Sequence, residues 1–272
     1  FQMLEDIAEE LSGEEVVFPT CFDVALHIRK ALQDPDIALG KLVALINMEP
    51  LLSAKLLQQA NSAAYNPGNS EVRHLEAAIQ RLGLNLVRNT AMAVAMGQML
   101  RARDMAGFDA IARKLWLHTV HAASACYVIA RHFTRINPEE AMFAGLVHDL
   151  GAFYMLYRAT KYEELRARPE TLKYLIIRWH ESIGLAVLAS LGLPEEMVEA
   201  LRDHDVLRPA PAVPKTLRDV VYVGNLIAGG IYEWDQHSPD EQDYERPEMN
   251  ECYLALCDEI ESRRAEMLAV FN

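Results

Sequence analysis

The dipeptide His148-Asp149 stands inside the run Ala144 to Gly151, whose other residues are all apolar or glycine. A segment with this composition has to be buried, and a buried imidazole or carboxylate is costly unless a partner meets it. The chain must therefore fold so that other polar groups or a cation surround this pair. Histidine and aspartate are both metal ligands, so the pair indicates a metal centre or the remains of one.

Apolar residues recur at helical spacing along almost the whole chain, which predicts an all-α protein. The expected helices lie at 39–46, 52–60, 75–82, 86–100, 111–133, 138–157, 172–191 and 251–271. Pro194 with two following glutamates is typical of a further helix start. The best strand candidate is Val220–Val223, but Gly224 and the alanine after it favour a buried helix.

The polar stretch Arg101–Gly107 indicates a hinge between two helical lobes. We expect an N-terminal helix over 1–17, a first lobe over 18–107 and a second lobe over 108–232. An acidic loop and a C-terminal helix are expected over 233–272. Phe1 and Gln2 are interpreted as a tag remnant, with Met3 as the natural start.

The formal net charge of −13 argues against nucleic acids and anionic membranes as partners, because both attract lysine and arginine. Acidic residues follow Met3 where a signal peptide would be basic. The longest nearly apolar run, Val220–Tyr232, is too short to cross a bilayer. The four cysteines form no C-x-x-C pair, which is typical of reduced thiols. We therefore expect a cytoplasmic protein with no membrane association.

Five polar residues of the second half lie in or beside apolar helices: His118, His148, Asp149, His180 and His204. Imidazole and carboxylate are ligands expected for Fe, Mn, Ni or Zn ions, and the helices of a bundle can each supply one ligand. A single histidine on an apolar face is more often a hydrogen-bonded core residue than a ligand. The adjacent His148-Asp149 pair favours metal ligation instead.

Short motifs accompany these residues in both halves of the chain. They are Phe18-Pro19, Asp34-Pro35-Asp36, Met48-Glu49-Pro50, Leu57–Tyr65, Ala77–Gly83, Leu115–His118, Ala144–Gly151, Trp179–Gly184 and Gly192–Glu195. Together they resemble the HDOD (HD-related output domain) family of bacterial signalling proteins, within the HD superfamily of metal-dependent phosphohydrolases. The resemblance runs from about Phe18 to Gly230. It implies an HDOD-specific first lobe and an HD-like helical bundle as the second.

The resemblance also implies roles for the polar residues. In HD phosphohydrolases a histidine, the His-Asp pair and a later aspartate hold a metal ion, whose bound water attacks phosphorus. His118, His148 and Asp149 match the first three positions, with Asp149 as the catalytic residue. His180 and His204 match the extra histidines of members with two metal ions, so an active site would hold one or two divalent ions bridged by Asp149.

Three positions depart from the family pattern. Asn225 stands where the distal aspartate is expected, and an amide holds a dication less tightly than a carboxylate. Ala152 replaces a lysine available to phosphate, and Asp205 replaces the second histidine of a double-His motif but still offers a carboxylate. The Gly-Tyr-Pro signature of cyclic-di-GMP phosphodiesterases is absent.

Three functional hypotheses follow, and whether the chain is an enzyme stays open among them. The first is a regulatory module with a degenerate HD site, in which the first lobe, around Asn61–Tyr65, binds an unknown signalling protein. The second is a metal-dependent phosphohydrolase acting on a nucleotide or another phosphate ester. The third is a nucleic-acid-binding regulator, indicated by the helix-glycine-helix pattern of Ile79–Arg88 and opposed by the net charge. A homodimer through the final helix is also compatible with the sequence.

Overall fold

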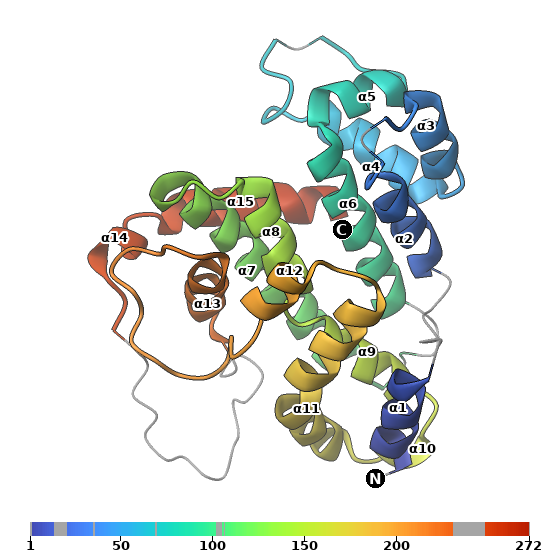
Figure 1. Cartoon of the computed structure of the whole chain (residues 1–272), viewed down its shortest axis with the longest axis vertical. Coiled ribbons are helices and arrows are strands. Elements are labelled where there is room, and N and C mark those ends of the chain that lie inside the picture. Colours follow the sequence, from blue (N-terminus) through green and yellow to red (C-terminus); the bar gives the residue numbers. More distant parts are fainter. Residues whose placement is uncertain are drawn as a thin grey trace. The chain divides into compact units, whose positions relative to one another are not determined.

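The computed structural model describes residues 2–13, 21–34, 36–68, 70–101, 105, 107–230 and 248–271 (Figure 1). Every regular element within these ranges is a helix, so the protein is all-α, as predicted. The motif Phe18-Pro19, the residue Pro35, most of the expected hinge and the acidic stretch 233–247 lie outside the described residues. The chain forms two compact units, a large one of Phe1–Val17 with Leu100–Ala265 and a small one of Phe18–Met99 with Glu266–Asn272.

The small unit is a cluster of short helices. They are α2 (Cys21–Ala31), α3 (Leu39–Asn47), α4 (Pro50–Ala60), α5 (Leu75–Leu82) and α6 (Leu84–Leu100). Helix α3 packs on α2, α4 and α5, and Leu42, Ile46 and Leu56 fill the core at helical spacing. Helix α4 begins where the chemistry favours it, because Pro50 has no N–H to satisfy and the Glu49 carboxylate accepts the Leu51 N–H.

Hydrogen bonds of the Asn61 side chain fix the connection between α4 and α5. The Asn61 side chain accepts the Val72 N–H at 2.8 Å and donates to the Val72 carbonyl at 2.7 Å. The Arg81 guanidinium donates to the carbonyls of Ala60 and Ser70 from the other side. These bonds satisfy the backbone of an irregular segment and fix its shape.

The large unit is a helical bundle in which α7 (Asp109–Phe133) packs on α8 (Pro138–Val147) and α13 (Leu217–Ile227). Helix α9 (Leu150–Ala159) packs on α11 (Pro169–Ser190), and α12 (Glu195–Ala200) packs on α13. The unit also contains α1 (Gln2–Ser12), α10 (Glu163–Arg166), α14 (Glu251–Leu254) and most of α15 (Cys257–Phe271).

Two sequence expectations for this bundle have opposite outcomes. The segment Val220–Val223 is helical, as predicted, in a helix whose start is fixed by a capping box between Thr216 and Asp219. The single helix expected over 138–157 is wrong, because α8 ends at Val147 and α9 begins at Leu150. The His148-Asp149 pair therefore lies at a junction between two helices, in a place that hydrophobic periodicity does not mark.

Helices α9 and α11 approach each other at Gly151 and Gly184. A Cβ added at Gly151 would lie 2.0 Å from the His180 carbonyl oxygen and 2.5 Å from the Gly184 nitrogen. Both of these atoms belong to the backbone, so a rotamer change cannot relieve the clash. The absence of a side chain at Gly151 is therefore a requirement of this helix contact.

Helix α1 is joined to the large unit by a polar cluster. The Glu10 carboxylate pairs with the buried Arg158 guanidinium and accepts the Tyr154 hydroxyl, and the Tyr162 hydroxyl donates to Asp6. Hydrogen-bonded ion pairs of this kind allow a charged arginine to be buried.

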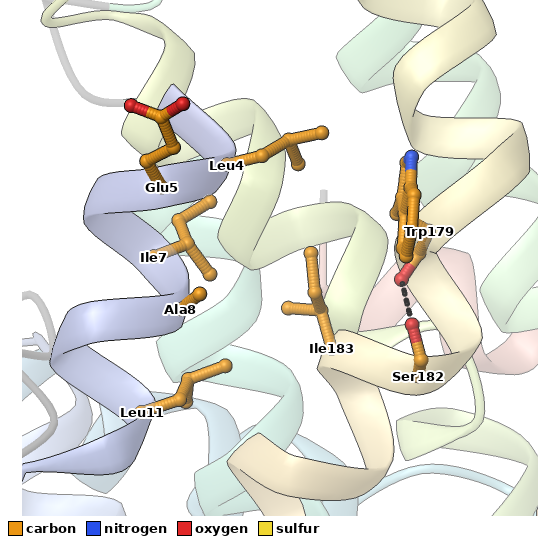
Figure 2. Close-up of a pocket in the computed structure, with 8 residues that line it drawn as sticks. All are labelled: Leu4, Glu5, Ile7, Ala8, Leu11, Trp179, Ser182 and Ile183. Atoms are coloured by element: carbon orange, nitrogen blue, oxygen red, sulfur yellow. Dashed lines mark hydrogen bonds between the residues drawn. The ribbon is translucent and has the colours of Figure 1, made fainter. Parts of the chain in front are cut away.

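On another face of α1, Leu4, Ile7 and Leu11 face Trp179 and Ile183 of α11 across an apolar pocket of about 370 Å³ (Figure 2). The pocket is lined mainly by carbon, and the Ser182 hydroxyl at its wall donates to the Trp179 carbonyl. Among the helices that the structure describes, none combines the length and apolar content needed to cross a membrane.

We expect Gly151→Ala to lower the free energy of unfolding by about 3 kcal/mol or more, because backbone has to move to admit the methyl group. Gly40→Ala is the matched control: Gly40 is an exposed helical residue with nothing within 4 Å of the added Cβ, and its replacement should be neutral or slightly stabilising. Urea unfolding followed by circular dichroism measures both. Equal stabilities of the two variants would contradict the close contact.

Candidate metal centre

The five residues singled out in the sequence come together inside the large unit, and all of them are buried. His118 lies in α7, His148 directly follows α8, and Asp149 directly precedes α9. His180 lies in α11, and His204 follows α12. Four separate segments of the bundle thus converge on one point.

The helix junction at His148-Asp149 explains how the carboxylate becomes available. Asp149 is the N-cap residue of α9, a position where an aspartate side chain normally accepts backbone N–H groups of the first turn. Its side chain makes no such capping bond. The carboxylate faces the four histidines instead.

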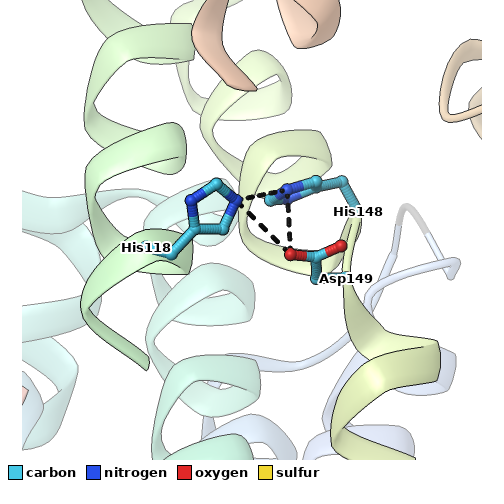
Figure 3. A group of neighbouring side chains, drawn as sticks. All are labelled: His118, His148 and Asp149. Carbon is cyan, nitrogen blue, oxygen red and sulfur yellow. Dashed lines mark hydrogen bonds and ion pairs between the residues drawn. The ribbon is translucent and has the colours of Figure 1, made fainter. Parts of the chain in front are cut away.

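Each oxygen of Asp149 meets a different pair of histidines. Oδ2 lies 3.4 Å from Nε2 of His118 and 3.3 Å from Nε2 of His148, and these two nitrogens are 3.2 Å apart (Figure 3). Oδ1 lies 3.4 Å from Nε2 of both His180 and His204, which are again 3.2 Å apart. We call these groups the first triad (His118, His148, Asp149) and the second triad (Asp149, His180, His204).

The other ring nitrogen of every histidine contacts a backbone carbonyl. Nδ1 lies 3.2 Å from the Ala228 oxygen in His118, and 2.7 Å from the Gly145 oxygen in His148. In His180 and His204 the corresponding distances, to the oxygens of Ile176 and Leu201, are 2.9 Å and 2.8 Å. A carbonyl accepts only, so Nδ1 carries the proton in all four rings. In each neutral ring, Nε2 then presents its lone pair to the centre of the cluster.

This arrangement fits a metal ion in two respects. Donors bound at about 2.1 Å to one ion lie about 3.0 Å apart at octahedral angles and about 3.4 Å apart at tetrahedral angles, which is the spacing within each triad. The Nε2 atoms of each histidine pair also face each other at 3.2 Å with both Nδ1 atoms donating elsewhere. Two lone pairs at this distance repel each other unless a proton or a metal ion lies between them. The set has the composition of a divalent-metal site, and its geometry leaves the choice of metal open.

The two triads differ in their electrostatics. Burial lowers the pKa of His148 to about 4, so its imidazole is a neutral ligand at pH 7. Burial also opposes the charged form of His204, but the carboxylates of Asp205 and Asp149 outweigh it and raise the pKa to about 10. Burial opposes ionisation of Asp149, but the surrounding imidazoles, His148 foremost, hold the pKa of its carboxyl well below the usual range. Without metal, the charge of the ionised Asp149 is therefore balanced by a protonated His204, and a divalent ion would have to displace that proton.

Two further residues border the second triad. Asp205 Oδ2 lies 3.1 Å from Nε2 of His180. The sequence position of Asp205 next to His204 suggests this proximity without establishing it. Asn225, which stands at the position of the expected distal aspartate, is buried and bonds to Asp205. Ala152 is fully buried and brings no charge to the site.

Comparison with known proteins gives one matching family and several related chains. The family described as HDOD domain matches residues 18–207. An uncharacterized protein of Treponema pallidum is 28% identical over 231 residues, which cover 80% of this chain and 42% of that protein. The chain therefore spans less than half the length of this relative.

Solved structures share the fold. A candidate metal-dependent phosphohydrolase from Shewanella amazonensis matches with a TM-score of 0.70 and 21% identity, over 100% of this chain and 98% of that one. A candidate signal transduction protein from Marinobacter aquaeolei matches with a TM-score of 0.58 and 19% identity, over 99% of this chain and 64% of that one. At these identities the similarity demonstrates the fold alone.

We expect Asp149→Asn to remove bound metal, because the variant loses the one charged side chain that both triads share. The measurement is elemental analysis of the protein purified without chelator and after reloading with Mn²⁺ or Zn²⁺. Asp36→Asn, which alters an exposed carboxylate, is the control and should keep the wild-type content. An Asp149→Asn protein that retains all of its metal would contradict the assignment.

Proposed function

The chain belongs to the HDOD domain family, and we propose that it is a signalling module whose buried HD centre binds divalent metal ions and hydrolyses a phosphate ester. The observation that carries the proposal is the Asp149 carboxylate placed between two pairs of histidines with every Nε2 directed at it. A histidine set that served only the core would not need four Nε2 atoms directed at one carboxylate.

The chain's own residues would perform three tasks in this chemistry. The four histidines hold their Nε2 lone pairs in fixed directions through the Nδ1 contacts, so little reorganisation is needed on binding. Asp149 would help to hold both ions, because each of its oxygens faces one histidine pair. The closely packed helices around the triads keep bulk water away from these groups. When bound, a divalent ion supplies an acidified water as nucleophile and polarises a phosphoryl oxygen.

The missing lysine at Ala152 is compatible with this activity. Two divalent ions carry four positive charges, and the carboxylates of Asp149 and Asp205 supply two negative ones. Neutral imidazoles leave the sum unchanged, so a loaded centre remains positively charged and attracts a phosphate group without lysine. We therefore assign the recognition of phosphate to the ions rather than to a basic side chain.

A regulatory module acting through protein contacts is the second candidate. It is favoured by the Asn61 segment of the small unit, which is fixed by bonds to Val72 while Ala63 and Ala64 are exposed. A rigid exposed segment loses little entropy on binding a partner. The related Marinobacter protein, described as a candidate in signal transduction, supports the same class of function.

The nucleic-acid hypothesis receives less support. The helix-glycine-helix pattern exists, with α5 and α6 joined at Gly83. However, Arg81 is engaged with Ala60 and Ser70, and Arg73 pairs with Glu71. Cations occupied within the chain are less available to phosphate backbones.

We expect the Mn²⁺-loaded protein to hydrolyse a phosphodiester such as bis-p-nitrophenyl phosphate, or a nucleotide from a panel. Asp149→Asn should lower the rate by about 100-fold or more, because the metal-activated water is lost. The release of nitrophenol or phosphate is measured with and without EDTA, followed by addition of Mn²⁺. A fully loaded protein that hydrolyses nothing would overturn the enzymatic proposal and leave the regulatory one.

The regulatory candidate makes a different prediction. Replacing the exposed Ala63 by glutamate should reduce co-purification of a signalling partner, while Asp149→Asn should leave it unchanged. Quantitative mass spectrometry of proteins retained by each variant provides the measurement. Equal recovery with Ala63→Glu and the wild type would count against this surface.

A further inference from the structure

Besides Asp149, a second carboxylate lies at the second triad. Asp205 Oδ2 is 3.1 Å from Nε2 of His180 and 3.7 Å from Nε2 of His204. These separations resemble those that Asp149 makes with the same two nitrogens.

Asn225 holds this carboxylate in place from α13. Its Nδ2 donates to Asp205 Oδ1 at 2.8 Å and to the His204 carbonyl at 3.0 Å. Both amide protons are therefore directed at the turn that carries His204 and Asp205. Because Oδ1 of Asp205 is engaged by the amide, Oδ2 is left to face the histidines. Asn225 itself is only 1% exposed, so these bonds form away from solvent.

An aspartate could not replace Asn225 in this position. A carboxylate donates nothing, so the bonds to Asp205 and to the His204 carbonyl would both be lost. Two carboxylates would also lie at hydrogen-bond distance from each other in a buried place, where like charges repel strongly. The amide is therefore what this geometry requires, although it departs from the family pattern.

We propose, building on the proposed metal-binding function, that Asp205 is a ligand of the ion in the second triad and that Asn225 is its positioning residue. The two metal positions then differ, with four protein donors at the second triad and three grouped at the first among the described residues. Three donors leave an open coordination position for water and substrate, whereas four close the site. The first triad is accordingly the reactive position, and the second holds its ion more tightly.

Three variants of the full chain test this inference by the affinity and number of bound Zn²⁺ ions. Titration calorimetry or competition with a chromophoric chelator provides both numbers, and circular dichroism verifies the helical content. We expect the wild type to bind two ions, one more tightly than the other. Asp205→Asn should weaken the tighter ion by more than about tenfold and leave the weaker one in place. Asp203→Asn, a matched change in a side chain that is 41% exposed and pairs with Arg218, should leave both unchanged.

Asn225→Asp separates the positioning role from simple loss of a ligand. If Asn225 positions Asp205, the variant should bind the tighter ion about tenfold more weakly, although it gains a carboxylate. If Asn225 is instead a ligand that has lost its charge, the same variant should bind one of the two ions more tightly and the other no more weakly, and this result would overturn the inference.

The experiment distinguishes failure of this inference from failure of the proposed metal-binding function. A wild type that binds two ions and an Asp205→Asn variant with unchanged affinities would overturn this inference alone. A wild type that binds no ion would overturn the proposed metal-binding function together with it.

Discussion

The large unit depends on one buried carboxylate surrounded by imidazoles. Asp149 is ionised in a place with little access to water, and its charge is compensated by side chains that reach it from other segments of the bundle. The Nδ1 atom of each imidazole is in turn fixed by a hydrogen bond to a backbone carbonyl. The helices of the bundle therefore share a polar core in addition to their apolar one, and a displacement of any one of them changes the geometry at Asp149.

The packing of α9 on α11 connects this polar core to the hydrophobic one. Gly151 lies two residues after Asp149 and touches the carbonyl of His180, which is itself a member of the second triad. The close contact of the two glycines sets how far the carboxylate stands from the imidazole. A residue with no side chain thus controls a distance within the candidate metal centre, and the same constraint explains the glycine that closes the apolar run in the sequence.

Local patterns predicted some of these features and not others. Helical periodicity and the adjacent His148-Asp149 pair were sufficient for the fold class and for the residues that converge. Hydrophobic periodicity does not reveal the break between α8 and α9, because apolar residues flank His148-Asp149 on both sides. The bond between Asp205 and Asn225 joins a turn and a helix twenty positions apart, so no spacing rule reveals it. The assignment of α1 to the large unit likewise depends on contacts of Glu10 and Asp6 with distant residues.

The interpretation of a residue that departs from a family pattern depends on the residues that contact it. Asn225 alone suggests a site that has lost a ligand. Beside Asp205, whose carboxylate accepts its amide proton, Asn225 belongs to an arrangement that holds an acidic group at the second triad. A site in decay has no reason to keep a buried amide N–H aligned on the Asp205 carboxylate. The alignment of Asn225, Asp205 and His180 is instead what the proposed cation site requires, whether that site serves hydrolysis or holds the bundle in one conformation.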